Sequence, residues 1–362
     1  MSARPVIIMA GGTGGHVFPA LALARLLRER SCEVVWLGTR RGLEARIVPA
    51  ERIAIEWLSI GGLRGKGVLT WFAAPFRLAL ALVQALAVMW RHRPSAVVGL
   101  GGFVTGPGGV AAWLTRRPLV IHEQNAIAGF TNRCLAHLAR EVLEAFPGSF
   151  GADIPAHAIG TPVRADIAAV AAPATRFAAR SGAMRLLVLG GSQGATRLNA
   201  VVPFALARLT DTISIETRHQ AGERWLEPAR TNYASAGVRA SVVPFIDDMA
   251  AAYAWADLVI CRAGALTVSE LAAVGVGAIL VPFPAAVDDH QSANAAYLVR
   301  EGAAVLIADR ELSVERLAAE LGRLCAGRGK LLSMAERARL LARPRAAEDL
   351  AQACLKFARC AA

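Results

Sequence analysis

The feature that most constrains the fold is a repeated alternation of short apolar runs with glycine-containing loops. In the first half of the chain the runs are PVIIMA, EVVWLG, AVVG and PLVIHE, each followed by a loop and a helix-like stretch. Such continuous apolar runs are typical of parallel strands buried on both faces. The alternation begins again at MRLLVLGGSQGA and continues through TISIET, ASVVPF, DLVIC and AILVPF. The two series predict an α/β chain with two doubly wound, Rossmann-like parallel-sheet domains.

The break between the two series lies in residues 161–185, which are rich in alanine, contain prolines and lack a strand pattern. We therefore predict a first domain over residues 1–162 and a second over 163–345, flanking a cleft. Residues 346–362 alternate apolar and charged positions at helical spacing, so we expect a C-terminal helix that packs back on the first domain.

The charge balance indicates an anionic partner. The 362 residues carry a formal net charge of +12, with a pI near 10.4. Few of the basic residues are lysines, and the basic residues are dispersed along the sequence. The sequence contains no zinc knuckle and no RNP-like segment. A phosphorylated small molecule or an anionic membrane surface therefore fits better than a nucleic acid.

Metal ligands and cofactor motifs are not apparent in the sequence. The six cysteines never approach CxxC spacing, which predicts reduced thiols rather than a zinc site or a disulfide framework. No D-x-D-type carboxylate pair is present to hold a divalent ion between phosphates. We expect neither a protein-bound metal nor a cofactor.

Two glycine loops in the first half are candidate anion sites. AGGTGGH follows the first strand and opens a helix, where free backbone N–H groups can bind a phosphate. It is not G-x-G-x-x-G, and no acidic residue ends the second strand, so a dinucleotide is disfavoured. A turn for close packing is the alternative. GLGGFVTGPGG is a second such loop, and the pair could enclose a diphosphate. His16, in the first helical turn, is either a base or a helix-start hydrogen-bonding residue.

The stretch IHEQNA places four polar side chains at the end of a strand. Burying them without partners is costly, so they suit a site rich in hydroxyl groups, such as a sugar. An ordinary loop with an Asx turn is the alternative.

In the second half, CRAGALTVSE predicts a helix whose first N–H groups face a diphosphate. Glu270, one turn further on, could accept hydrogen bonds from ribose hydroxyls, or could belong to a capping box with Thr267. Ser192 in GGSQGA could hold a phosphate. Gln291 in DDHQSANA would point from a helix N-terminus towards the cleft.

The segment over residues 62–94 combines arginines and a lysine with Trp71, Phe72 and Phe76. A basic rim around aromatic residues suits peripheral attachment to anionic lipid, and an amphipathic helix that faces the core is the alternative. The uncharged stretch from Leu78 to Trp90 is shorter than the roughly 20 residues that span a bilayer.

Nine motifs in order along the chain carry a resemblance to a known family. They are GGTGGH, GLRGKG, GGFVTGPGG, HEQN, GTPVR, GGSQGA, PFIDDMAAAYAWAD, CRAGALTVSE and DDHQSANA. Together they resemble the MurG family of GT-B glycosyltransferases. The resemblance implies inverting transfer of N-acetylglucosamine (GlcNAc) from UDP-GlcNAc to the C4 hydroxyl of undecaprenyl-pyrophosphoryl-MurNAc-pentapeptide (lipid I). The product, lipid II, serves peptidoglycan synthesis at the cytoplasmic face of the inner membrane.

The resemblance also implies roles for individual residues. Glu270 would bind the ribose, Ile246 the uracil, and Ser192 a phosphate. The other residues expected to contact UDP-GlcNAc are Thr13, Gly14, Gly15, Asn125, Arg164, Ala265, Leu266, Thr267, Val268, Ser269 and Gln291. The acceptor diphosphate is expected at Gly102, Thr105 and Gly106. Thr161 and Phe103 stand where the family commonly has asparagine and tyrosine, which leaves the fine shape of the sugar pocket open.

Inversion requires a base near the attacking hydroxyl, and His16 is the candidate, with Glu123 as the alternative. Other functions stay open at this point. They are another GT-B transferase or a UDP-GlcNAc 2-epimerase with a soluble substrate, and a nucleotide-sugar sensor without catalysis.

Overall fold

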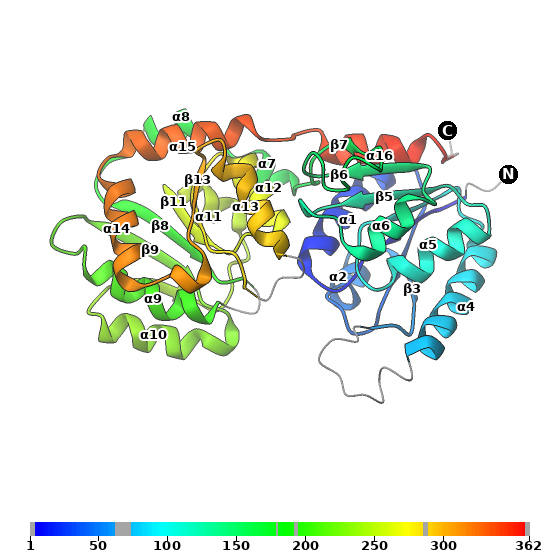
Figure 1. Cartoon of the computed structure of the whole chain (residues 1–362), viewed down its shortest axis with the longest axis horizontal. Helices are drawn as coiled ribbons and strands as arrows, with labels where there is room; N and C mark the ends of the chain where they lie inside the picture. Colours follow the sequence, from blue (N-terminus) through cyan, green and yellow to red (C-terminus); the bar gives the residue numbers. More distant parts are fainter. Residues whose placement is uncertain (1–3, 62–73, 179, 192–194, 285–288, 359–362) are drawn as a thin grey trace. The chain divides into compact units, whose positions relative to one another are not determined.

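A computed structural model describes residues 4–61, 74–178, 180–191, 195–284 and 289–358 (Figure 1). The chain divides into two compact units. Unit 1 comprises residues 1–164 and 343–362, and unit 2 comprises residues 165–342. Trp71, Phe72 and Ser192 lie outside the described residues.

Unit 1 is built on a seven-stranded parallel sheet with strand order β3-β2-β1-β4-β5-β6-β7. Strand β1 pairs with β2 on one side and β4 on the other, and its four residues are fully buried. The strands are β1 (Val6–Met9), β2 (Val34–Gly38), β3 (Ala54–Trp57), β4 (Ala96–Gly99), β5 (Leu119–Glu123), β6 (Glu141–Glu144) and β7 (His157–Ala158). The ladder order reverses direction at β1 and β4, which places the loops after these two strands at the topological switch point.

The helices of unit 1 pack on both faces of this sheet. They are α1 (Gly14–Glu29), α2 (Glu44–Ala50), α4 (Ala74–His92), α5 (Thr105–Leu114), α6 (Phe130–Ala136) and α16 (Ala346–Leu355). Helix α16 contributes Leu350, Ala351 and Cys354 to the cluster of buried side chains that α1 also lines. The prediction of a C-terminal helix packed back on the first domain is therefore confirmed.

Unit 2 has a six-stranded parallel sheet with strand order β10-β9-β8-β11-β12-β13. Its strands are β8 (Met184–Leu189), β9 (Ile215–Gln220), β10 (Ser241–Val243), β11 (Leu258–Cys261), β12 (Gly277–Leu280) and β13 (Ala304–Leu306). Its helices are α7 (Ala165–Ala168), α8 (Pro173–Ala178), α9 (Thr196–Ala207), α10 (Leu226–Ser235), α11 (Met249–Trp255), α12 (Ala265–Val274), α13 (His290–Val299), α14 (Val314–Cys325) and α15 (Arg328–Leu340), with 3-10 turns at Glu223–Trp225 and Asp309–Glu311.

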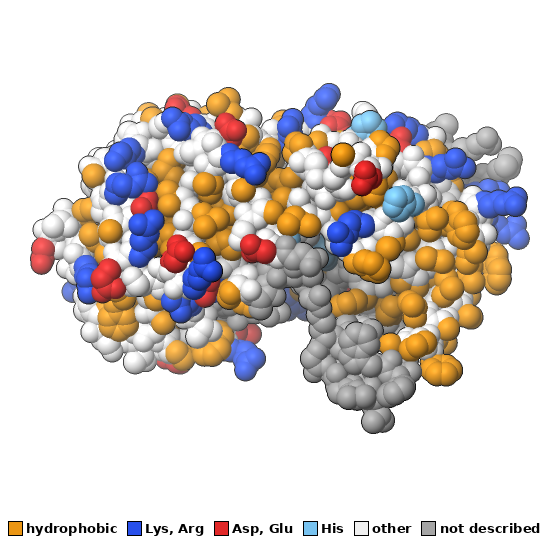
Figure 2. Space-filling view, in the orientation of Figure 1, with side chains coloured by type: hydrophobic (Ala, Val, Ile, Leu, Met, Phe, Trp, Pro, Cys, Tyr) orange, Lys and Arg blue, Asp and Glu red, His pale blue; other side chains and the backbone are white. Residues whose placement is uncertain are grey.

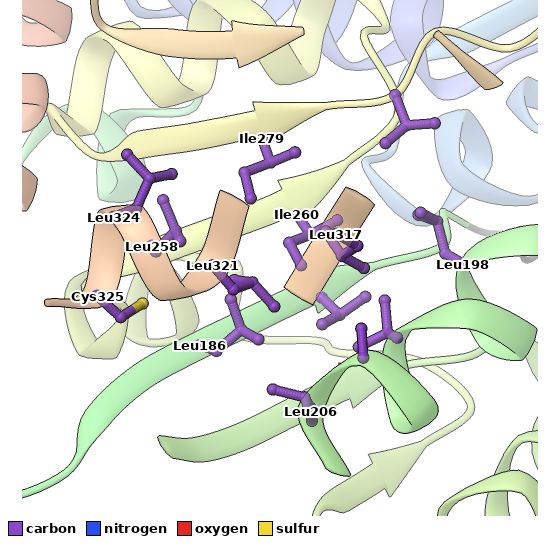
Figure 3. Close-up of a cluster of buried hydrophobic side chains, with 14 of the residues drawn as sticks. Leu186, Leu198, Leu206, Leu258, Ile260, Ile279, Leu317, Leu321, Leu324 and Cys325 are labelled. Atoms are coloured by element: carbon purple, nitrogen blue, oxygen red, sulfur yellow. The ribbon is translucent and has the colours of Figure 1, made fainter. Parts of the chain in front are cut away.

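One face of the unit 2 sheet is covered by α9 and α14. Figure 3 shows Leu186, Leu258 and Ile260 from the central strands meeting Leu317 and Leu321 of α14. All five side chains are almost completely buried. The predicted α/β fold with two Rossmann-like units is confirmed.

Four strands were not predicted, and three of them carry a weak apolar signal. Strand β3 is an edge strand with partly exposed side chains, and β7 is two exposed residues long. Strand β13 is also an edge strand and is only partly buried. Edge strands lack the continuous apolar run that marks a central parallel strand. Strand β6 is an inner strand, but its Val142 and Leu143 stand between two glutamates.

The cysteine prediction holds for four residues and fails for one. Cys134, Cys261, Cys325 and Cys354 are free thiols. Cys32 is disulfide-bonded. CxxC spacing marks metal and redox motifs, and its absence does not exclude a disulfide.

Candidate functional site

The first glycine loop leads from β1 into α1. Thr13 is the N-cap residue of α1, and its side chain makes no capping hydrogen bond. The N–H groups of Gly14 and Gly15 begin the helix, where backbone donors have no intrahelical partner. Thr13 is exposed and both glycines are half-buried, so the start of α1 is accessible to an anion.

The second glycine loop packs directly against the first. Gly102 has a φ of +87°, and a Cβ there would lie 2.5 Å from the carbonyl oxygen of Gly11. At Gly101, with a φ of +107°, a Cβ would lie 2.6 Å from Nδ1 of His16. Only glycine fits at both positions, so the predicted juxtaposition of the two loops is present within unit 1.

The other two residues expected at the acceptor diphosphate differ in accessibility. The hydroxyl of Thr105 is fully buried and donates to the carbonyl of Gly101 at 2.9 Å. It therefore shapes the loop rather than facing a ligand. A Cβ at Gly106 would meet only the Thr131 methyl group at 3.6 Å, so this backbone has more space around it.

His16 is half-buried and is the first member of a chain of polar groups. Its Nδ1 lies 3.0 Å from Oε1 of Gln124, whose Nε2 lies 3.1 Å from Nδ1 of His122 and 3.2 Å from the His122 carbonyl oxygen. Nε2 of His122 lies 2.8 Å from the carbonyl oxygen of Gly160. Burial lowers the pKa of His122 below its ordinary value, and the Gly160 hydrogen bond only partly opposes this effect.

Glu123 holds the loop that follows β5. Its Oε1 accepts from the backbone N–H and the side-chain amide of Asn125, at 2.9 and 3.0 Å. Its Oε2 accepts from Gly129 N–H at 3.1 Å and from the amide of Asn132 at 2.8 Å. The carboxylate is almost completely buried. With four donors on its two oxygens, it is poorly placed to take a proton from a substrate, so the geometry favours His16 over Glu123.

Arg164 lies at the end of unit 1, with its guanidinium carbon 5.5 Å from the ring centre of Phe18 in α1. Asn125, on the β5 side, has its amide nitrogen committed to Glu123. Arg164 and Asn125 both belong to unit 1, as do Thr13 and His16.

In unit 2 the residues expected at the donor diphosphate form the start of α12. The N-cap is Gly264, without a side-chain cap, and the helix begins at Ala265. Leu266, Thr267 and Ser269 are half-buried, whereas Ala265 and Val268 are buried. The Ser269 hydroxyl donates to the Ala265 carbonyl at 2.9 Å. Since Gly264 is the cap, the capping-box alternative for Thr267 and Glu270 is wrong.

Glu270 is buried one turn into α12. Its Oε2 accepts a 3.0 Å hydrogen bond from the hydroxyl of Tyr253 in α11. This bond fixes the orientation of the carboxylate. Ile246 lies half-buried in the loop between β10 and α11. Gln291, in the first turn of α13, accepts from the backbone N–H of Phe283 at 2.9 Å, so its carbonyl oxygen is already engaged.

Several contributing residues have no sequence signal. Glu44 is fully buried and accepts from Gly12 N–H at 2.9 Å, and from the N–H and hydroxyl of Thr39. Tyr253 was not expected at Glu270. Arg262 binds Asp309 at 2.6 Å beside the start of α12. Apart from the Thr39 contacts, these hydrogen bonds join residues 17 to 47 positions apart, which motif spacing cannot reveal.

Helix α4 carries the apolar surface of the predicted membrane segment. Phe76, Leu80, Val83 and Trp90 are 50 to 78 % exposed, and with Ala87 they recur every three or four residues. That spacing places them on one side of the helix. Figure 2 shows hydrophobic side chains gathered over α4. Helix α4 also faces the core, as the alternative expects, through the buried Ala85, Val88 and Met89, whereas Phe76 and Trp90 lie on its exposed side.

Helix α4 is 19 residues long, more than the stretch predicted from Leu78 to Trp90. By length and composition it is the one helix of the described residues that could cross a membrane, a test that core helices also pass. Among the described residues no group of three or more His, Cys, Asp or Glu side chains is arranged to hold a metal ion.

Comparison with known proteins identifies two family domains. The N-terminal domain of glycosyltransferase family 28 matches residues 6–144, and the C-terminal domain of that family matches residues 185–350. Relatives from Nitrosococcus oceani and Alkalilimnicola ehrlichii are 59 % and 60 % identical over 98 % of this chain, and the matches cover 98 % and 99 % of their own lengths. Both are named UDP-N-acetylglucosamine--N-acetylmuramyl-(pentapeptide) pyrophosphoryl-undecaprenol N-acetylglucosamine transferase.

Solved structures agree with this assignment. The crystal structure of Acinetobacter baumannii MurG is 42 % identical, with a TM-score of 0.85 over 98 % of this chain and 99 % of that chain. A Neisseria meningitidis UDP-GlcNAc 2-epimerase bound to UDP-GlcNAc has a TM-score of 0.68 over 97 % of this chain and 100 % of that chain, at 11 % identity. The second likeness is one of fold alone.

Proposed function

This chain belongs to glycosyltransferase family 28, and we propose that its two units divide the transfer of GlcNAc from UDP-GlcNAc to lipid I between them. It is a glycosyltransferase of peptidoglycan synthesis, and its product is lipid II. The observation that carries this conclusion is the identity of 59 to 60 % over 98 % of the chain to relatives bearing the transferase name.

Unit 2 binds the donor. The start of α12 offers backbone N–H groups from Ala265 onward to the diphosphate, and Glu270 accepts from the ribose hydroxyls one turn further on. The hydrogen bond from Tyr253 supports this role, because a carboxylate already oriented loses less entropy on binding. Ile246 contacts the uracil, and Ser192 and Gln291 assist at the phosphate and the sugar.

Unit 1 binds the acceptor diphosphate at its two glycine loops and supplies the base. The accessible start of α1 and the close packing of Gly102 on Gly11 support this assignment. Thr13, Gly14 and Gly15 also touch the donor, beside the acceptor diphosphate. Asn125 and Arg164 are the other unit 1 residues that we assign to the donor.

Transfer requires one bond to form and one to break. The C4 hydroxyl oxygen of the acceptor attacks the anomeric carbon of GlcNAc on the face opposite the UDP, which inverts that carbon. His16 takes the hydroxyl proton as the new glycosidic bond forms. The bond to UDP breaks, and the N–H groups at the start of α12 stabilise the charge that develops on the leaving diphosphate.

Helix α4 attaches the enzyme to the cytoplasmic face of the inner membrane. The exposed apolar stripe supports this placement, since isolated apolar residues are common on surfaces but a continuous stripe is not. Arg77 and Arg93 lie near the two ends of α4, and both are exposed, as anionic lipid requires.

Release of UDP from UDP-GlcNAc, measured with and without a lipid I analogue, tests the proposed function. Release that depends on the analogue and yields a disaccharide product supports it. Epimerised sugar without acceptor would favour the epimerase, and binding without UDP release would favour a sensor.

A further inference from the structure

We propose that Gln124 and His122 are positioning residues that hold neutral His16 in the tautomer protonated at Nδ1, leaving the Nε2 lone pair for the acceptor hydroxyl. The inference deepens the proposed function and rests on the role of His16 as base. It follows from which atom donates and which accepts in each hydrogen bond between His16 and Gly160.

The series of hydrogen bonds that starts at His16 ends at a backbone carbonyl oxygen, which can only accept a hydrogen bond. The Gly160 carbonyl oxygen lies 2.8 Å from Nε2 of His122, so that nitrogen carries a proton. His122 is fully buried, and desolvation lowers its pKa, so the ring is neutral. A neutral imidazole protonated at Nε2 has an unprotonated Nδ1, which accepts.

The next group, Gln124, is oriented by two acceptors at once. Its Nε2 lies 3.1 Å from Nδ1 of His122 and 3.2 Å from the His122 carbonyl oxygen. The opposite orientation of the amide would place its oxygen against both acceptors, so the assignment of nitrogen and oxygen follows from the surroundings. Oε1 of Gln124 is therefore the atom that faces His16.

An amide oxygen has no proton to give, so Nδ1 of His16, 3.0 Å away, is the donor. The neutral His16 ring then carries its lone pair on Nε2. No described residue makes a hydrogen bond to this Nε2, and the ring is half-buried. Gly101 covers the edge of the ring that contains Nδ1 and Cε1, since a Cβ there would lie 2.6 and 2.7 Å from these atoms.

The arrangement also explains why Gly160 begins the GTPVR motif. With a φ of +88°, a Cβ at this position would lie 2.3 Å from the Cβ of Arg343. Glycine therefore allows the backbone conformation that aims its carbonyl at His122. The HEQN and GTPVR motifs are thus joined by the hydrogen bond between His122 and Gly160, and Gln124 links His122 to the base.

Histidine-selective ¹⁵N labelling and two-dimensional NMR of the full chain test the tautomers directly. His16→Gln and His122→Gln spectra assign the signals by loss of a peak set. We expect His16 protonated at Nδ1 and His122 at Nε2 in the resting enzyme at neutral pH. A His16 protonated at Nε2, or one averaged between the two tautomers, would overturn the proposal.

Gln124→Met keeps a similar length and removes both amide contacts. We expect kcat to fall by about 10- to 100-fold, less than on loss of the base itself, with an unchanged KM for UDP-GlcNAc. In the same variant the His16 signals should leave the Nδ1-protonated pattern. A fall in kcat with the Nδ1-protonated pattern of His16 retained would contradict the positioning role of Gln124.

Failure of the proposed positioning of His16 and failure of the proposed function give different results. If His16→Ala keeps the wild-type kcat while the wild-type spectrum shows the expected tautomers, the base assignment is wrong and the tautomer assignment stands. If Gln124→Met does not fold, the wild-type spectrum alone still decides the tautomer.

Discussion

The carboxylate of Glu44 accepts a 2.9 Å hydrogen bond from the backbone N–H of Gly12, 32 residues earlier in the chain. The carboxylate also accepts hydrogen bonds from the backbone N–H and the hydroxyl of Thr39, and the Glu44 side chain is fully buried. The first glycine loop is therefore held in place by a protein carboxylate, so Gly12 N–H is occupied and the donors left for an anion are those at the start of α1.

Replacing Glu44 should destabilise unit 1. Glu44→Ala leaves the N–H groups of Gly12 and Thr39 without their partner, and we expect a loss of about 2–4 kcal/mol in the free energy of unfolding. Urea denaturation of the full chain measures the change. Glu33→Ala, at an exposed glutamate, is the matched control. A loss below about 1 kcal/mol would contradict the role of Glu44.

Tyr253 should affect donor binding through Glu270. Tyr253→Phe removes the hydroxyl that orients the carboxylate, so KM for UDP-GlcNAc should rise about 3- to 10-fold, near the net contribution of one hydrogen bond. Glu270→Ala should raise it further, with a smaller effect on kcat. Steady-state kinetics at saturating acceptor measure both.

Tyr297→Phe is the control for Tyr253, because its hydroxyl donates to the Leu341 carbonyl rather than to Glu270. It should leave the donor KM unchanged. Equal effects of the two tyrosine variants would show that the change is not specific to Glu270.

Stability should fall with acidity through His219. Burial lowers the pKa of His219 from 6.5 to about 4. The unfolded chain therefore binds more protons than the folded chain between these two pH values. The contribution of neutral His219 to stability is complete above pH 6.5. It is lost as the pH falls towards 4, by up to about 1.4 kcal/mol per pH unit. His219 Nε2 donates to Oδ1 of Asn199 and its Nδ1 accepts from the Tyr233 hydroxyl, both at 2.9 Å, so protonation at Nδ1 makes this hydroxyl turn from donor to acceptor.

Urea denaturation between pH 4 and 7 measures this dependence. His219→Gln should be less stable at neutral pH but should lose less stability on acidification. His137→Gln, at an exposed histidine, should behave as the wild type. An unchanged pH slope in His219→Gln would rule out this histidine as the source.

Membrane attachment should depend on the α4 stripe. Phe76→Ser and Val83→Ser each remove an exposed apolar side chain, and each should weaken partition into vesicles of anionic phospholipid about 10- to 150-fold, given about 1.5–3 kcal/mol for burying such a group. Flotation at several lipid concentrations measures the partition. Leu340→Ser is the control, since Leu340 is 85 % exposed in unit 2. Equal losses in all three variants would argue against α4.

The central strands and the glycine loops were predictable because their signals are local. Strand β1 is a continuous apolar run, and the loops after β1 and β4 follow from strand ends meeting at one edge of a parallel sheet. The roles of Glu44 and Tyr253 could not be predicted, since each depends on a contact formed only by the tertiary fold. HEQN indicated a polar site, but the partner of His122 lies 38 residues away, at Gly160.

The central claim is that His16 removes the proton from the acceptor hydroxyl, and the kcat of His16→Ala with a lipid I analogue tests it most directly. We predict a fall in kcat of about 10²- to 10⁴-fold with KM for UDP-GlcNAc unchanged, while His137→Ala keeps wild-type activity. A kcat in His16→Ala equal to that of the wild type would contradict the claim.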